Sequence, residues 1–145
     1  MPDAHLPAWI LWSLLSVTFA ALTAIFAKVG VEHINSDLAT WIRTVVVLVV
    51  LGGLLVVRGW PQPLASVSGR TYLFLALSGM ATGASWVCYF RALQLGDAAR
   101  VAPLDKLSVV LVAVFGVVFL GERLALHGWF GVMLIAAGVV LIALP

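Results

Sequence analysis

The chain has 145 residues, of which 63% are hydrophobic and only 10% are charged, and its mean hydropathy is +1.16. A soluble domain usually carries about 25% charged residues, so this chain has too few of them to cover a surface that faces water. A soluble enzyme, a nucleic-acid binder and a disordered linker are therefore disfavoured, and the net charge of +2 comes from scattered residues rather than from a basic patch.

Five long apolar runs follow one another along the chain, each about as long as a helix that crosses a bilayer. None of them alternates like a strand of a membrane barrel, and all are too long for buried strands. We therefore predict an all-α polytopic membrane protein with five transmembrane helices, forming a single domain over residues 1–145. The helices are expected at about 8–29, 38–57, 72–95, 98–120 and 129–144.

Turn-forming residues separate the runs. The second helix is expected to start after the turn-like Asn35-Ser36-Asp37, with Asp37 as its N-cap. Residues 58–63 contain two prolines and end that helix. Pro103 lies within the first two turns of the fourth helix. It either bends that helix modestly, which we favour, or breaks it and exposes backbone groups to a cavity.

Five spans place the two ends of the chain on opposite sides of the membrane, here named side A for the N-terminus and side B for the C-terminus. The basic residues of loops and helix ends are shared equally: Arg58, Arg70 and Arg123 on side A, and Lys28, Arg91 and Arg100 on side B. Orientation normally follows an excess of such residues on the cytoplasmic side. Two alternatives therefore stay open: one orientation with the N-terminus outside, or insertion both ways, which would give antiparallel pairs.

Charged residues inside apolar runs are costly in a membrane and often mark functional sites. Asp105 lies about 10 Å from the start of the fourth predicted helix and Arg43 about 7 Å from the start of the second, both counted from side B. An Asp105–Arg43 pair is therefore allowed, whereas the adjacent Asp105 and Lys106 are expected to point about 100° apart. The cluster is a structural ion-pair network, a substrate or proton site, or a lysine that reaches back to side B.

Two predicted helices carry a stripe of weakly polar and aromatic residues on one face. The third helix has Ser78, Thr82, Ser85 and Tyr89 at helical spacing, with Trp86 beside them, and the first helix has a related stripe. Each stripe alone suits helix packing, but together they suit the wall of a cavity for a small organic solute. The candidate wall residues are Trp12, Ser16, Thr82, Ser85, Trp86 and Tyr89.

The chemistry of common enzymes and pumps is missing from the sequence. It has no HExxH motif, no clustered carboxylates, no Cys and His ligand set and no Walker-type glycine loop. We therefore predict a protein that is not an enzyme and that uses no metal and no cofactor. Three functions remain possible for the chain: a secondary carrier, a partner subunit and a passive membrane scaffold.

Several short motifs occur in a fixed order over nearly the whole chain. They are residues 24–30, Trp41-Ile-Arg43, Tyr89-Phe-Arg-Ala-Leu-Gln-Leu-Gly96, residues 101–108, Phe119-Leu-Gly-Glu-Arg-Leu124 and residues 128–131. In order and spacing they resemble EamA-type proteins of the drug/metabolite transporter superfamily. Lys28, Arg43, Pro103 and Glu122 occupy positions that recur in that family, whereas Asp105-Lys106 departs from the plainer apolar stretch of many members.

The resemblance implies a secondary transporter of small organic metabolites or drugs, often an exporter, which works by alternating access in the inner (plasma) membrane. Longer members have ten helices as two inverted halves, and this chain resembles one half. The expected partners are therefore membrane lipid, an antiparallel second copy or a similar five-helix chain, and a small-molecule substrate, with no nucleic acid.

We expect Asp105 to be the best candidate for proton coupling, with Arg43 or Lys106 as its charge partner and Lys28 in the same network. Pro103 is the expected helix break. The alternative function is a non-transporting accessory or scaffold subunit. The sequence does not identify the substrate, the direction of transport or the coupling ion.

Overall fold

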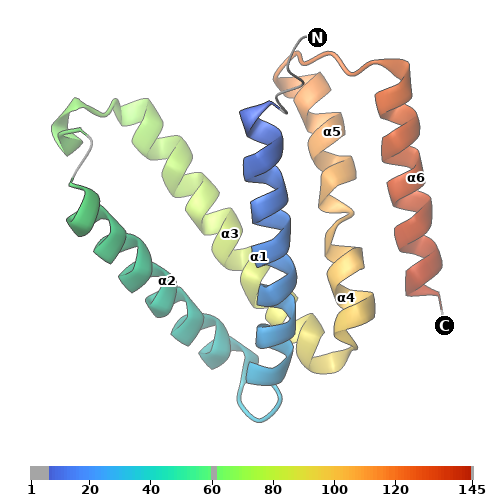
Figure 1. Cartoon of the computed structure of the whole chain (residues 1–145), viewed down its shortest axis with the longest axis horizontal. Helices are drawn as coiled ribbons and strands as arrows, with labels where there is room; N and C mark the ends of the chain where they lie inside the picture. Colours follow the sequence, from blue (N-terminus) through green and yellow to red (C-terminus); the bar gives the residue numbers. More distant parts are fainter. Residues whose placement is uncertain (1–6, 60–61, 145) are drawn as a thin grey trace, which may run out of the picture. The chain divides into compact units, whose positions relative to one another are not determined.

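The computed structural model describes residues 7–59 and 62–144, and every regular element in these residues is helical. Within these two ranges, five helical segments are long and apolar enough to cross a membrane, with α4 and α5 together forming the fourth. The predicted all-α polytopic fold is therefore confirmed. The elements are α1 (Ala8–Gly30), α2 (Ser36–Arg58), the short 3₁₀ helix η1 (Leu64–Ser66), α3 (Gly69–Leu95), α4 (Ala98–Asp105), α5 (Ser108–Phe119) and α6 (Leu126–Ala143) (Figure 1).

The helices form two compact units. Residues 27–95, here named the hairpin unit, contain the last turn of α1 and the antiparallel helices α2 and α3. The residues before 27 and after 95, here named the terminal unit, contain the rest of α1 together with α4, α5 and α6.

Side-chain caps fix the starts of both long helices in the hairpin unit. The Asn35 side-chain oxygen accepts hydrogen bonds from the backbone N–H groups of Asp37 (2.8 Å) and Leu38 (3.3 Å), so α2 begins at Ser36. The expected cap at Asp37 is wrong, because that residue already lies in the first helical turn. Ser68 accepts from the backbone N–H of Thr71 at 3.1 Å, which explains why α3 begins before the expected residue 72.

The core of the hairpin unit lies only at its side-B end. There α2 and α3 pack together beside the end of α1, and buried residues gather near the loop 31–35. Beyond Arg43 in α2 and before Trp86 in α3, no described residue is buried. The two helices are thus held together at one end. The buried residues of the unit are Ala27, Val31, Ser36, Ala39, Thr40, Phe90 and Leu93.

Two long-range hydrogen bonds secure this end of the unit. Lys28 Nζ donates to the backbone carbonyl of Leu93 at 2.8 Å, and Gln94 Nε2 donates to the carbonyl of Ile34 at 2.9 Å. The last carbonyls of a helix have no partner within the helix, so the Lys28 ammonium both satisfies one of them and complements the negative end of the α3 dipole.

In the terminal unit, α6 lies along α4 and α5 (Figure 1). Val132 and Val139 are buried and stand seven residues apart, which places them on one face of α6. Gly121 has a φ of +68°, a left-handed conformation that suits glycine, and it reverses the chain after α5. The Glu122 carboxylate then lies against buried Gly116, where a Cβ would stand 2.7 Å from Oε2.

The fourth span is interrupted between α4 and α5. Lys106 and Leu107 form a turn. The backbone N–H of Lys106 donates to the backbone carbonyl of Pro103 at 2.9 Å, and the backbone N–H of Leu107 donates to the carbonyl of Leu104 at 3.1 Å. These bonds span three residues rather than four, so the turn is tight but its donors are satisfied. The expected modest bend at Pro103 stays a prediction, and so does a break at that residue. Pro103 lies inside α4 and the break follows it, although proline sterically disturbs the turn that precedes it.

Most apolar side chains of the spans point outward. About 6% of the most apolar window of each span is buried, and Val56 and Val57 are 77% and 85% exposed. Lipid chains are as apolar as these side chains, so exposure to lipid carries no hydrophobic cost. The long faces are thus available to lipid or to another protein.

Candidate functional site

The most unusual contact inside the spans joins α2 to α3. The Arg43 guanidinium carbon lies 4.1 Å from the ring centroid of Trp86 and 5.4 Å from that of Phe90. Trp86 and Phe90 are four residues apart, so one face of α3 presents both rings to the cation. Phe90 is buried, and Arg43 and Trp86 are partly buried.

The two rings account for the charge at this depth. Arg43 follows the start of α2 by seven residues, which corresponds to about 10 Å along the helix. An arginine at the centre of a membrane helix costs about 2.5–3.5 kcal/mol on insertion scales. A desolvated cation–π contact contributes about 2 kcal/mol, so the Arg43–Trp86–Phe90 cluster offsets much of that cost.

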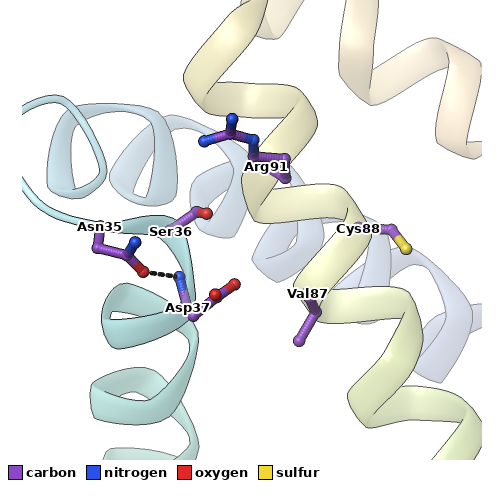
Figure 2. A pocket seen from close by; sticks show the side chains of 6 residues that line it. All are labelled: Asn35, Ser36, Asp37, Val87, Cys88 and Arg91. Atoms are coloured by element: carbon purple, nitrogen blue, oxygen red, sulfur yellow. Dashed lines mark hydrogen bonds between the residues drawn. The ribbon is translucent and has the colours of Figure 1, made fainter.

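A pocket of about 460 Å³ opens between the start of α2 and the last third of α3. Figure 2 shows Asp37 with its carboxylate directed toward α3, and Val87 directed toward α2. Asn35 turns back to the α2 backbone, where it makes its cap. The lining residues are Asn35, Ser36, Asp37, Val87, Cys88 and Arg91.

Opposite charges line this pocket from its two helices. Asp37 comes from the first turn of α2, and Arg91 comes from α3, one turn after Val87. One guanidinium nitrogen of Arg91 donates to the side-chain oxygen of Gln94 at 3.0 Å, which restrains the arginine. The pocket is therefore lined by an exposed carboxylate from α2 and by an exposed, restrained guanidinium from α3.

The predicted cavity-wall residues are only partly brought together. Trp86 joins the Arg43 cluster, and Tyr89 is partly buried with its ring 6.5 Å from that of Phe90. Thr82 and Ser85 are exposed on α3, and the Thr82 hydroxyl donates to the backbone carbonyl of Ser78 at 2.9 Å. Trp12 and Ser16 are exposed on α1, in the terminal unit. A cavity that these six residues share stays a prediction.

The predicted charge network is rearranged. Lys106 Nζ lies 3.1 Å from Asp105 Oδ2, so the expectation that these neighbours point apart is wrong. That expectation assumed a continuous helix, but α4 ends at Asp105 and the long lysine side chain turns back to it. Lys28 binds the end of α3 instead. Asp105 and Arg43 belong to different units, and their pairing stays a prediction.

Sequence reasoning missed the pocket residues and Phe90. Asn35 and Asp37 were visible as turn and capping residues, and Phe90 as the position one turn after Trp86. What was missing is the register of the hairpin, which decides that residues 35–37 face Val87 and Arg91. In the described part of the chain, no group of three or more His, Cys, Asp or Glu residues is arranged to hold a metal ion.

Comparisons with known proteins agree with this picture. A family model described as the EamA-like transporter family matches residues 7–144. A Sinorhizobium protein named "uncharacterized transporter in cobO 3'region" is 65% identical over 137 residues, which are 94% of this chain and 96% of that protein.

More distant relatives carry a more specific name. A probable 4-amino-4-deoxy-L-arabinose-phosphoundecaprenol flippase subunit, ArnE, from Yersinia pestis is 30% identical over 84 residues, which are 58% of this chain and 74% of that protein. Its counterpart from Yersinia pseudotuberculosis matches to the same extent. No solved structure matches the chain. The family match over nearly its whole length, together with the motifs described above, shows that this chain belongs to the EamA-like transporter family.

Proposed function

We propose that the chain is one half of a secondary carrier, in which two antiparallel copies move a small organic metabolite or drug by alternating access. The observation that carries this proposal is the hairpin unit, which is closed at side B and has no buried residue beyond Arg43 and Trp86. The polar stripe of α3 and the Arg43 cluster thus form part of a wall, and a second copy would supply the rest.

The balance of charge supports pairing of opposite orientations. Loops and helix ends carry three basic residues on each side, so neither orientation is favoured strongly during insertion. Two oppositely inserted copies would be related by a two-fold axis in the membrane plane, which is the symmetry of many carriers. By family resemblance we propose export across the inner membrane as the direction and place of transport.

A labelling experiment tests the antiparallel pair. Cys88 is the only cysteine, so a Cys88→Ser protein with one cysteine added after Pro145 carries a single reporter thiol. A maleimide that cannot cross the membrane should label this thiol in intact cells, and a comparable share in inside-out vesicles. A cysteine in a membrane protein of known single orientation is the control. Labelling from one face only would contradict the proposal.

A second arrangement is supported by one comparison. The Yersinia relatives are named as flippase subunits, a word that places them in an assembly. This chain would then pair with a different small membrane chain, either as the other half of the carrier or as a non-transporting accessory. The purified chain, reconstituted alone into liposomes, separates these cases. Transport by the single species supports the homodimer, and transport only with a co-purified second chain supports the mixed assembly.

A further inference from the structure

We infer that the pocket of the hairpin unit binds the polar group of a small zwitterion, with an ammonium at Asp37 and a phosphate or other oxyanion at Arg91. As a substrate class for the carrier, this inference rests on the proposed function. The binding itself requires no transport and can be measured separately.

The two charged side chains of the pocket, Asp37 and Arg91, do not pair with each other. They line the same pocket, and they form no ion pair across it. No described group donates a hydrogen bond to the Asp37 carboxylate, since Asn35 supplies the side-chain cap of α2. The carboxylate is thus available to a ligand.

The Arg91 side chain is restrained by a hydrogen bond and keeps donors for an oxyanion. Its contact with Gln94 uses one of the guanidinium nitrogens, and Gln94 is itself fixed by its bond to the Ile34 carbonyl. A guanidinium has five N–H donors in a planar fork, which matches the oxygens of a phosphate or carboxylate. The remaining donors of Arg91 can therefore bind an anion in the pocket whose volume is about 460 Å³.

A ligand with both charges suits this pocket better than a ligand with one. A singly charged cation could contact Asp37 but not Arg91, and a singly charged anion could contact Arg91 but not Asp37. Hydrogen bonds that involve a charged group are stronger than neutral ones. The volume is within the range of pockets that hold small molecules.

The pocket and the deeper Arg43 cluster are built from the same two helices, α2 and α3. Ser36, which lines the pocket, and Arg43 are seven residues apart and therefore lie on one face of α2. On α3, Val87 of the pocket directly follows Trp86 of the cluster, so these two side chains point about 100° apart around the helix.

Calorimetry on the purified protein in detergent tests the inference with three probes: 2-aminoethyl phosphate, ethanolamine and methyl phosphate. The zwitterion should bind at least about tenfold more tightly than either singly charged probe, because it gains a second charge-assisted contact. Asp37→Asn should reduce its affinity to that of methyl phosphate, and Arg91→Gln to that of ethanolamine. Asp97→Asn and Arg100→Gln, which remove the same charges from exposed residues outside the pocket, should change nothing.

A second measurement leaves both charges in place and does not depend on how the charge variants fold. In a Val87→Cys/Cys88→Ser protein, alkylation of the pocket thiol should slow as 2-aminoethyl phosphate is added, but not with ethanolamine at the same concentration. A Met80→Cys/Cys88→Ser protein places the thiol two turns away on α3 and should show no protection. Equal affinity for all three probes, or an unprotected thiol at position 87, would overturn the inference.

The two proposals fail in different ways. Zwitterion binding without transport in liposomes would contradict the carrier and leave the pocket assignment standing. Transport of a solute that needs neither Asp37 nor Arg91 would support the carrier and contradict the pocket assignment.

Discussion

Arg43 and its two aromatic partners show how single residues decide what this membrane protein can hold. The guanidinium lies 4.1 Å from the Trp86 ring and 5.4 Å from the Phe90 ring, in a helix whose other neighbours are largely apolar. The sequence predicted that Arg43 matters, because a charge in an apolar run is rare. It did not predict the partner, because a contact between residues 43 and 86 depends on how α2 and α3 are aligned.

Removal of the Trp86 ring should destabilise the hairpin unit. We expect Trp86→Leu to lower the free energy of unfolding in detergent by about 1–2 kcal/mol, since the Arg43 cation loses the indole ring, which is the most favourable cation–π partner. The free energy of unfolding of Trp86→Phe should lie between those of the wild type and Trp86→Leu. Thermal unfolding followed by circular dichroism measures this loss. Trp41→Leu is the matched control, because Trp41 is 64% exposed on α2. Equal destabilisation by both leucine variants would contradict the role assigned to the cluster.

At the scale of elements, the length of each apolar run was enough to predict the spans, but local side chains set their ends. Asn35 and Ser68 cap α2 and α3, so both helices begin before the first apolar residue of their runs. Hydropathy contains no signal for such caps. The break after Asp105 was also unforeseen in its position, because the proline rule points to the turn before Pro103 rather than to the turn after it.

The interrupted fourth span leads to a prediction about coupling. Asp105 lies at the end of α4 and pairs with Lys106 at 3.1 Å, so loss of the Asp105 charge would remove an ion pair at the point where the span is discontinuous. We expect wild-type transport in proteoliposomes to vary with pH, and Asp105→Asn transport to be insensitive to it. Asp97→Asn, the same change at the exposed start of α4, should keep the wild-type profile. An unchanged profile in Asp105→Asn would exclude this residue from coupling.

At the scale of the whole molecule, composition predicted a membrane protein and the apolar runs predicted five spans, and the described residues confirm both. The sequence could not show that the hairpin unit is packed at one end only, because burial depends on contacts between helices. Ser78, Thr82 and Ser85 illustrate the limit. Their spacing predicts one face of α3, but it does not say whether lipid, another helix or a solute covers that face.

Orientation should be adjustable by a few charges if the pair is antiparallel. A Gln62→Lys/Ser66→Lys variant adds two basic residues to side A, and a Glu32→Lys/His33→Lys variant adds two to side B. Each should insert in a single, opposite orientation and lose transport when expressed alone, because it lacks an inverted mate. Co-expression of the two should restore transport.

The control for this experiment is co-expression of either variant with a second, differently tagged copy of itself, which should stay inactive. Full transport by one variant alone, with its orientation confirmed by labelling from a single face, would show that inverted pairing is unnecessary.

The odd number of spans has a consequence for the gene as well as for the protein. Since α1 begins on one side and α6 ends on the other, a second copy joined to the end of the first would start on the far side and run upside down. A tandem duplication with a short linker would therefore create an inverted repeat in a single step. A chain with an even number of spans would first have to acquire another crossing.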